Sequence, residues 1–496
     1  MESQRLTHKA SQQSPYERKS EDSAYQKRVQ EIISAVKGRE PGQMLALKKA
    51  NPGHRPHDLS FKNDCHPVDI DQLTNILEIN VENKTVRVEG LVTLGSLCRE
   101  TLKHNLIPQV VPEYETFTVA GLINGLGIET SSHKYGLFPE ALISMDIVLG
   151  DGSLVTANKD NNSDLFYAVP GSYGTLGIIT SATLQLCDAS PYIHSQYHYF
   201  TDIDRYVEAF GASLKHTDFV EGFVLSKESY VLITGNFADR VDTLSIYDAM
   251  KYGNVWYYQH AEKMAKVGGE DLIGTYQYMF RHQRSLFWLS GIIAGLPIFE
   301  KSRVLRAYLD RKVEEKVSKN GFKSNMDVFT RERSMVNQDY GVELPKLTKG
   351  IRYVQDNLGV YPIWNCATTI KDSPFLMIRD QGHFATSMLV DVGIYGEPTV
   401  KNYKNIDAMR ALQTNEGKVA LWGVSYLSKE ELEASYDHDA YTTVRRKYHA
   451  DSAFKDLFSK TKFIDPDKHK QGFIPHWRLL NLWLDIKVGI RSLAGK

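Results

Sequence analysis

Four glycines lie close together in the stretch TVAGLINGLGIETSSHKYGLF, which runs from Thr118 to Phe138. Closely spaced glycines let the backbone approach a ligand, often a phosphate, and they also allow tight turns. The hydroxyls of Thr130, Ser131 and Ser132 follow directly. The spacing alone predicts either a loop that contacts a phosphate or the polar edge of a flat ring, or a tight turn without a ligand.

The spacing of these glycines differs from the dinucleotide-binding fingerprint. That fingerprint is G-x-G-x-x-G between an apolar strand and an amphipathic helix, whereas this stretch has G-x3-G-x-G. The residues that follow, IETSSHKYG, lack helical periodicity, and Pro108 and Pro112 interrupt the residues that precede it. We therefore expect a loop of backbone N–H groups, without a phosphate held at a helix N-terminus. A second cluster, GSYGTLG at Gly171–Gly177, opens an apolar segment and alone predicts only a turn.

The two clusters are set among short strands and few helices. We expect a helix over Asp22–Lys37 and a second helix capped by Thr93. Hairpins are expected within 76–90 and 143–157, and a further strand within 174–186. This is the pattern of an α+β protein.

Length and composition bound the kind of protein. A chain of 496 residues is too long for one ordinary core, so we expect two domains. The formal net charge of -1 indicates no basic surface, and we expect no nucleic-acid partner. The four cysteines form no CxxC pair, so we expect neither a disulfide framework nor a metal site.

The sequence also bears on location and membranes. The polar N-terminal segment has no signal-peptide core, so we expect an intracellular protein. No segment reaches the roughly 20 apolar residues that span a bilayer, and the nearest, 285–299, is broken by Pro297. Residues 473–496 combine an apolar helical face with basic residues, which is typical of an interfacial membrane helix and equally of a terminal helix docked on the protein.

An ordered set of motifs surrounds the glycine clusters. The set comprises a V-T-L-G helix start, the glycine stretch with S-S-H-K-Y-G, an L-G-D-G hairpin, S-D-L-F-Y-A-V and G-T-L-G. Together these motifs resemble the FAD-binding domain of the vanillyl-alcohol-oxidase (PCMH-type) flavoproteins. GIETSSHKYGLF and NSDLFYAVP narrow the resemblance to the Δ24-sterol reductases of the seladin/diminuto type, and RHQRSLFW, VYPIWNC and VDVGIYGEPTVKNY extend it over roughly residues 70 to 460.

The resemblance implies a fold and a domain order. The expected fold is α+β, with a PCMH-type FAD-binding domain of two α/β subdomains followed by an α+β cap, or substrate, domain. We expect a disordered tail at 1–20, the FAD-binding domain at 21–190, the cap at 191–462 and an amphipathic helix at 463–496. The boundary near 188–195 is also where glycine turns become rarer and helical stretches longer.

The resemblance further implies FAD as the cofactor, bound non-covalently. His54 and His57, in the loop NPGHRPHD, raise the question of a covalent flavin link, which some relatives make through His. That loop departs from the family pattern of the first phosphate-binding turn. The residues expected to contact FAD are Thr118, Val119, Ala120, Gly121, Leu122, Ile123, Asn124, Gly125, Leu126, Gly127, Ile128, Glu129, Thr130, Ser131, Ser132, His133, Tyr135, Gly174, Gly177 and Ile178.

Reduction of an isolated alkene requires a hydride on one carbon and a proton on the other. Tyr395, Glu397 and His282 are the expected catalytic residues, with Tyr361 as a further candidate donor. Each has a structural alternative: GIYGEP is also a turn sequence. Arg281 and Arg284 are suited either to pairing carboxylates or to binding a nicotinamide cofactor's phosphate.

The resemblance implies a sterol substrate, NADPH as the electron donor and a place in sterol biosynthesis. We expect peripheral contact with the endoplasmic reticulum membrane, with a cytoplasmic protein as the alternative. A competing hypothesis keeps the fold and FAD but makes the protein an oxidase or dehydrogenase of a polyol, hydroxy acid or other lipid.

Overall fold

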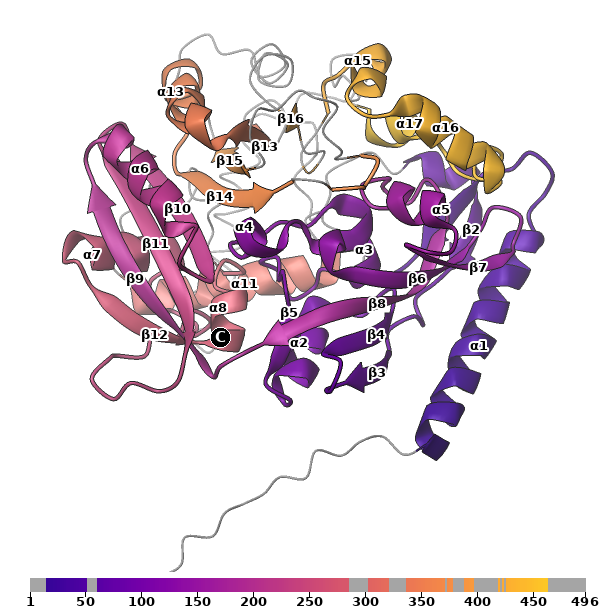
Figure 1. The fold of residues 1–496 in the computed structure, drawn as a ribbon, viewed down its shortest axis with the longest axis horizontal. Coiled ribbons are helices and arrows are strands. Elements are labelled where there is room, and N and C mark those ends of the chain that lie inside the picture. Colours follow the sequence, from indigo (N-terminus) through magenta and orange to yellow (C-terminus); the bar gives the residue numbers. More distant parts are fainter. Residues whose placement is uncertain are drawn as a thin grey trace, which may run out of the picture. The chain divides into compact units, whose positions relative to one another are not determined.

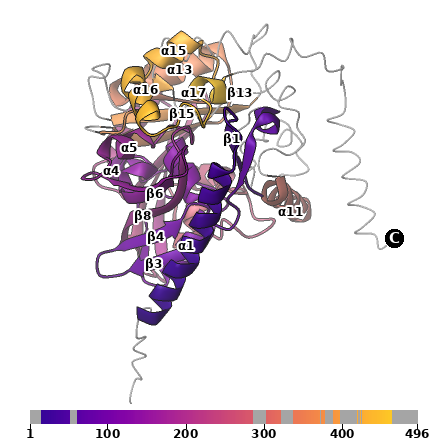
Figure 2. The same cartoon turned by 90° about the vertical axis from the view of Figure 1, so that its right-hand side faces the viewer.

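A computed structural model gives the fold of the chain (Figures 1 and 2). The described residues are 15–50, 60–284, 302–320, 336–370, 373–377, 388–396, 418–419, 422 and 425–462. Residues up to Lys462 form one compact unit, and Phe463–Lys496, which form a second unit, lie outside the described residues.

The first half of the chain is built on an antiparallel sheet of six strands. The strands are β3 (Ile76–Asn80), β4 (Thr85–Glu89), β5 (Leu106–Pro108), β6 (Leu142–Val148), β7 (Leu154–Asn158) and β8 (Ile178–Asp188). Their order is β3-β4-β8-β6-β7, and β5 also pairs with β8. The two predicted hairpins are confirmed as β3–β4 and β6–β7. A parallel pair, β1 (Leu45–Lys48) and β2 (His66–Asp69), precedes this sheet.

Several helical elements accompany this first sheet. The elements are α1 (Pro15–Lys37), η1 (Ser60–Asp64), α2 (Leu94–Leu102), α3 (Val119–Gly125), α4 (Ser132–Tyr135), η2 (Phe138–Ala141) and α5 (Ser163–Ala168). Helix α1 packs against β3 and β6 (Figure 2) and ends at Lys37 as predicted, but it begins at Pro15, within the tail expected to be disordered. The predicted cap of α2 is confirmed, because the Thr93 hydroxyl accepts a hydrogen bond from the Ser96 amide at 3.3 Å.

A second antiparallel sheet, of eight strands, follows. Its strands are β9 (Tyr192–Phe200), β10 (Phe219–Ser226), β11 (Ser229–Ala238), β12 (Glu270–Gly274), β13 (Val336–Glu343), β14 (Ile363–Thr369), β15 (Met388–Gly396) and β16 (Lys418–Val419). They are ordered β12-β9-β11-β10-β14-β15-β13-β16. The helical elements near it are α6 (Ile203–Ser213), α7 (Tyr257–Lys266), α8 (Thr275–Met279), α11 (Arg303–Asn320), η5 (Leu344–Lys346) and α13 (Leu347–Asn357).

The two faces of this second sheet have different neighbours. Helix α6 packs on β10 and β11, and α13 packs on β13 and β15 (Figure 1). The Tyr206 hydroxyl of α6 donates to Asn365 Oδ1 at 2.9 Å, and the Tyr340 hydroxyl donates to the Gly350 carbonyl at 2.8 Å. Asn365 of β14 and its partner Gly222 of β10 thus lie on the face that α6 covers. The residues that alternate with them along the two strands point to the opposite face, which α4 of the first half contacts.

The last described segment returns to the first half. It carries α15 (Lys429–Ala434), α16 (His438–Lys447) and α17 (Leu457–Thr461). The buried Arg445 guanidinium donates to the Thr175 carbonyl at 2.6 Å, beside the second glycine cluster, and the Leu45 amide donates to the Ala453 carbonyl at 2.7 Å. Residues 425–462, expected in the cap, therefore pack on the first half of the chain.

The fold is of the α+β class, as expected. Apolar side chains from both sheets and from residues 432–457 form one continuous buried core. Across the described parts of the chain, none of the helices has the length and apolar character needed to cross a membrane.

Candidate functional site

The glycine stretch differs from the expected loop, because its first part is the short helix α3. The Val119 and Ala120 amides donate to the carbonyls of Val92 and Gly90, and Leu126 ends the helix in the left-handed region with φ 59°. Bonds to a distant segment thus support a helix that the local sequence does not favour. The prediction of a continuous loop was wrong here.

The two glycine clusters, about fifty residues apart in sequence, meet in the structure. Asn124 Oδ1 accepts a hydrogen bond from the Gly174 amide at 2.8 Å, and the Asn124 carbonyl accepts one from the Tyr173 amide at 3.1 Å. A Cβ added at Gly125 would meet no protein atom within 4 Å. Gly174 has φ +70°, which disfavours any side chain. This adjoining glycine backbone fits the close approach that a flavin dinucleotide requires.

Gly177 and Ile178, also expected to contact FAD, lie where β8 begins against β6. A Cβ at Gly177 would lie 2.5 Å from Ile147 Cγ2, so close packing against β6 is sufficient reason for glycine here. Ile178 is buried and pairs with Val148.

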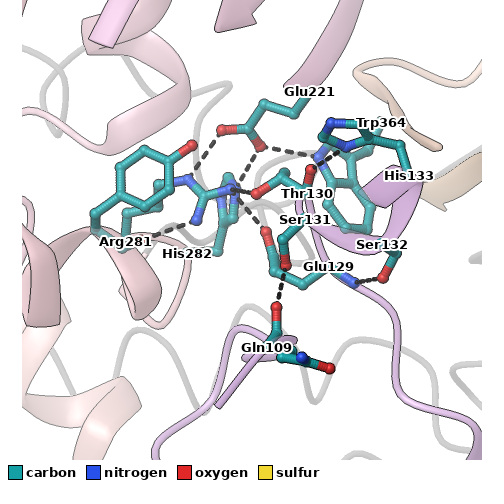
Figure 3. Close-up of polar contacts among 11 residues, drawn as sticks. Gln109, Glu129, Thr130, Ser131, Ser132, His133, Glu221, Arg281, His282 and Trp364 are labelled. Carbon is teal, nitrogen blue, oxygen red and sulfur yellow. Dashed lines mark hydrogen bonds and ion pairs between the residues drawn. The ribbon is translucent and has the colours of Figure 1, made fainter. Parts of the chain in front are cut away.

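The polar side chains after the glycines are engaged within the protein. Ser131 donates to the Gln109 carbonyl at 2.8 Å, and the Ser132 hydroxyl accepts from the Glu129 amide at 3.1 Å (Figure 3). His133 Nδ1 lies 2.9 Å from the Thr130 carbonyl. A cofactor that follows this stretch would therefore meet mainly its backbone.

Burial lowers the pKa of His133, although carbonyls near both ring nitrogens, those of Thr130 and Thr217, act in the opposite direction. His133 thereby links the glycine stretch to the residues just before β10. Tyr135, at the end of α4, is half-buried, and burial raises the pKa of its hydroxyl.

Arg281 is the centre of a buried charged cluster that joins the two halves of the chain (Figure 3). Its Nη2 donates to Glu129 Oε1 of the glycine stretch at 2.8 Å, and its Nε donates to Glu221 Oε1 of β10 at 2.9 Å. All three side chains are almost fully buried. Of the two roles left open for Arg281, the structure therefore supports carboxylate pairing.

His282 belongs to the same cluster. Its Nε2 lies 2.9 Å from Glu221 Oε2, which also accepts a hydrogen bond from Trp364 Nε1 at 3.0 Å. Burial alone would raise the pKa of Glu221, but Arg281 and His282 outweigh it and hold that pKa well below its usual range. Glu221 is thus a permanent anion that holds His282 in place.

The strand register extends this site across the second sheet. Glu221 pairs with Cys366, Cys366 with Asp391, and Asp391 with Gly341. Directly opposed residues of antiparallel strands point to the same face, as do alternate residues of one strand. Glu221 and Asp391 therefore share the face that α4 contacts.

The next row of the sheet places Asp339 opposite Gly393. A Cβ at Gly393 would lie 2.6 Å from the Tyr395 hydroxyl oxygen, so the tyrosine ring folds back across the glycine. That hydroxyl donates a hydrogen bond to Asp339 Oδ1. Tyr395, one of the predicted catalytic residues, thereby belongs to the same face as Glu221.

Three carboxyl groups that sequence reasoning missed complete the site. Burial raises the pKa of both Asp339 and Asp391, and Asp339 raises that of Asp391 further. Burial, followed by repulsion from Glu129 and Asp339, raises the pKa of Glu113 to about 8. The sequence signal for Asp391 was an acidic residue inside the apolar run SMLVDVGIYG, a position where an acid is rarely buried.

Other predicted residues lie elsewhere or outside the described residues. Tyr361 lies toward α13, which contains its neighbour Asp356. Burial, followed by Tyr230 and Asp356, raises the pKa of Tyr361 to about 12. Glu397, His54 and His57 lie outside the described residues. Within the described ranges, no group of three or more His, Cys, Asp or Glu side chains is arranged to hold a metal ion.

Comparison with known proteins identifies the cofactor and the family. Residues 50–158 match the family model described as FAD binding domain, which confirms the expected FAD. The Delta(24)-sterol reductase of Homo sapiens is 32% identical over 456 residues, covering 88% of this chain and 86% of the relative. That of Arabidopsis thaliana is 32% identical over 491 residues, covering 89% and 87%. Cytokinin dehydrogenase 4 of Oryza sativa is 33% identical over 140 residues, only 28% of this chain.

Identity at this level over almost nine-tenths of the chain spans both sheets as well as the FAD-binding residues. The chain belongs to the Delta(24)-sterol reductase family.

Proposed function

We propose that this protein reduces the Δ24 side-chain double bond of a sterol, with FAD as its cofactor and NADPH as the electron donor. The observation that carries the proposal is family membership over both sheets, because the relatives named Delta(24)-sterol reductase match far beyond the FAD-binding residues. The match to a cytokinin dehydrogenase covers too little of the chain to favour an oxidase or dehydrogenase.

The buried face of the second sheet suits the chemistry of this reaction. Reduced FAD supplies hydride, and the protein must supply a proton in surroundings that exclude water. Glu129 of the glycine stretch and Asp391 of β15 are both almost fully buried, and burial raises the pKa of Asp391 and of Glu113. Such groups remain protonated near neutral pH and can act as acids.

We propose Tyr395, Glu397 and His282 as residues of this active site. Tyr395 and His282 belong to the cluster of side chains on that face, through Asp339 and Glu221 respectively. Glu397 follows Tyr395 closely in sequence. If Tyr395→Phe and Glu397→Gln proteins both retained full turnover with flavin bound, neither residue would serve the reaction.

We also propose that the backbone of Thr118–Thr130 and of Gly174 contacts FAD, and that the flavin is held non-covalently. The support is the meeting of the two glycine clusters at Asn124. Denaturation of the purified protein tests the second point: non-covalent FAD is released into solution, whereas covalent flavin stays with the protein.

A sterol substrate is an apolar molecule that resides in membranes, so we propose peripheral contact with the endoplasmic reticulum membrane. The apolar and basic residues of 473–496 support this contact. Deletion of 473–496 is expected to shift the protein from the membrane to the soluble fraction. An unchanged distribution would exclude this segment as the contact.

The test of the proposed function is a single assay. Purified protein is incubated with NADPH and a Δ24-unsaturated sterol, and the product is examined by mass spectrometry. We expect a sterol heavier by two hydrogens, with NADH giving slower turnover. Hydrogen peroxide formed from a polyol, with no sterol reduction, would favour the competing oxidase function.

A further inference from the structure

We propose that Asp391 is the acid that protonates the double bond, and that Asp339 and Tyr395 form the route by which its proton is replaced. This inference rests on the proposed function and assigns its proton step. It depends on where β13 and β15 place these three side chains.

The Asp391 side chain lies in surroundings where ionisation of its carboxyl group is energetically unfavourable. It is 2% exposed, and neither Oδ1 nor Oδ2 has a hydrogen-bond partner among the described residues. Its cross-strand neighbours are Cys366 and Gly341, neither of which provides a cation. A buried carboxylate without a cation or a hydrogen-bond donor is strongly unfavourable, so Asp391 carries a proton.

Glu129, from the first half of the chain, also has a buried carboxylate oxygen without a partner among the described residues. Glu129 is 1% exposed, and its Oε2 has no partner among the described residues although its Oε1 is bound to Arg281. Glu129 raises the pKa of both Glu113 and Cys366, and Asp391 raises that of Cys366 as well. Glu129 and Asp391, each with an unpartnered oxygen, therefore both lie within electrostatic range of Cys366.

The charged and titratable groups around Asp391 favour its neutral form. Burial is the largest cause of its raised pKa, and Asp339 and Glu113 add to it. Arg281 lowers the pKa of Glu113 and Cys366, but its guanidinium is engaged by Glu129 and Glu221. The groups that face this region are Glu113 and Glu129 from the first half, Arg281, and Glu221, Asp339, Cys366 and Tyr395 from the sheet.

Asp339 and Tyr395 are placed to return a proton to Asp391. Asp339 lies opposite Gly393, two residues beyond Asp391 on β15, so the two aspartates are diagonal neighbours on one face. The Tyr395 hydroxyl is already bonded to Asp339. Tyr395 is thus better placed to pass a proton to the aspartates than to deliver one to the substrate.

The proposed step balances in atoms and electrons. The Asp391 O–H bond breaks and a C–H bond forms at the less substituted alkene carbon, which leaves Asp391 as carboxylate. The other carbon receives the hydride of the reduced flavin, so the sterol is reduced and the flavin oxidised. A proton from solvent then returns to Asp391 through Tyr395 and Asp339.

The test separates the two half-reactions of the FAD-loaded protein in Asp391→Asn. We expect the rate at which NADPH bleaches the flavin to be unchanged, and the rate at which sterol reoxidises it to fall about 100-fold or more. Asp339→Asn and Tyr395→Phe should leave the first turnover intact and slow later turnovers. The matched control is Asp310→Asn, which should change neither rate. Asp310 lies on α11, is buried and accepts a hydrogen bond from Trp256 Nε1.

A second readout does not depend on turnover. Infrared spectra of wild-type protein should contain the C=O stretch of a protonated carboxylic acid that Asp391→Asn removes and Asp310→Asn retains. A wild-type rate of sterol-dependent reoxidation in Asp391→Asn, or an unchanged infrared band, would overturn this inference. Wild-type protein that forms no sterol product would instead overturn the proposed function.

Discussion

Arg281 binds Glu129 through Nη2 at 2.8 Å, and both side chains are buried. This pair connects the glycine stretch to the segment after α8, and through Glu221 to the second sheet. Because removal of one partner leaves a buried charge uncompensated, the pair is more sensitive to truncation than an exposed ion pair.

Replacement of Arg281 by Met should destabilise the protein strongly. Glu129 and Glu221 would lose their shared cation, and we expect the free energy of unfolding to fall by about 3–5 kcal/mol. Denaturant titration followed by circular dichroism measures this change. Lys227→Met is the control, because Lys227 and Asp356 form an exposed pair, and it should alter stability by less than about 0.5 kcal/mol. Equal effects of the two substitutions would contradict the structural role of Arg281.

Gly393→Ala should disturb the site without removing any of its polar groups. The new methyl group would lie 2.6 Å from the Tyr395 hydroxyl and displace it from Asp339. We expect slower sterol turnover and a loss of about 1–3 kcal/mol of stability from overpacking. In Gly211→Ala of α6, the methyl group would meet Leu344 at 3.4 Å, an ordinary contact, and activity should be retained. If Gly393→Ala turned over sterol at the wild-type rate, the placement of Tyr395 across Gly393 would not matter for the reaction.

Gly125→Ala tests the proposed approach of FAD to the glycine stretch. The protein has room for the methyl group, so the midpoint of thermal unfolding without flavin should not fall. The affinity for FAD, measured by fluorescence titration, should fall about tenfold or more, which is about 1.4 kcal/mol. Gly211→Ala again serves as the control. Unchanged FAD affinity would show that the flavin does not contact Gly125.

Glu113 should make stability depend on pH. Its pKa is raised from 4.5 to about 8 by folding, so the folded protein binds this proton more tightly than the unfolded chain. Its contribution to the free energy of unfolding is therefore fully present below pH 4.5 and is lost as pH rises through about 8. Glu113→Gln should flatten the decline of the unfolding midpoint across this interval. A variant curve parallel to that of wild type would contradict a raised pKa at this position.

Local signals in the sequence predicted the elements that depend on local interactions. The β3–β4 hairpin follows from its polar turn, and the Thr93 cap follows from hydroxyl chemistry at a helix start. Helix α3 was missed because the carbonyls of Val92 and Gly90, distant in sequence, bind its first amides.

The composition of the site depended on pairing that no local pattern reveals. Asp339 and Asp391 come together only because β13 and β15 pair in one register, and a shift of one residue would place them on opposite faces. Similarly, the bond from Arg445 to the Thr175 carbonyl joins residues that are far apart in the chain. Tyr395 and His282 were predicted from the need of alkene reduction for a proton donor, and their partners Asp339 and Glu221 were found only in the structure.

The most direct measurement of the central claim is a single turnover without oxygen. Protein whose flavin has been reduced by NADPH is mixed with a Δ24-unsaturated sterol, and flavin absorbance and sterol mass are followed together. We predict that the oxidised flavin spectrum returns as the saturated side chain forms, one sterol for each flavin. Flavin that stays reduced in the presence of the sterol, with no saturated product, would contradict the proposal.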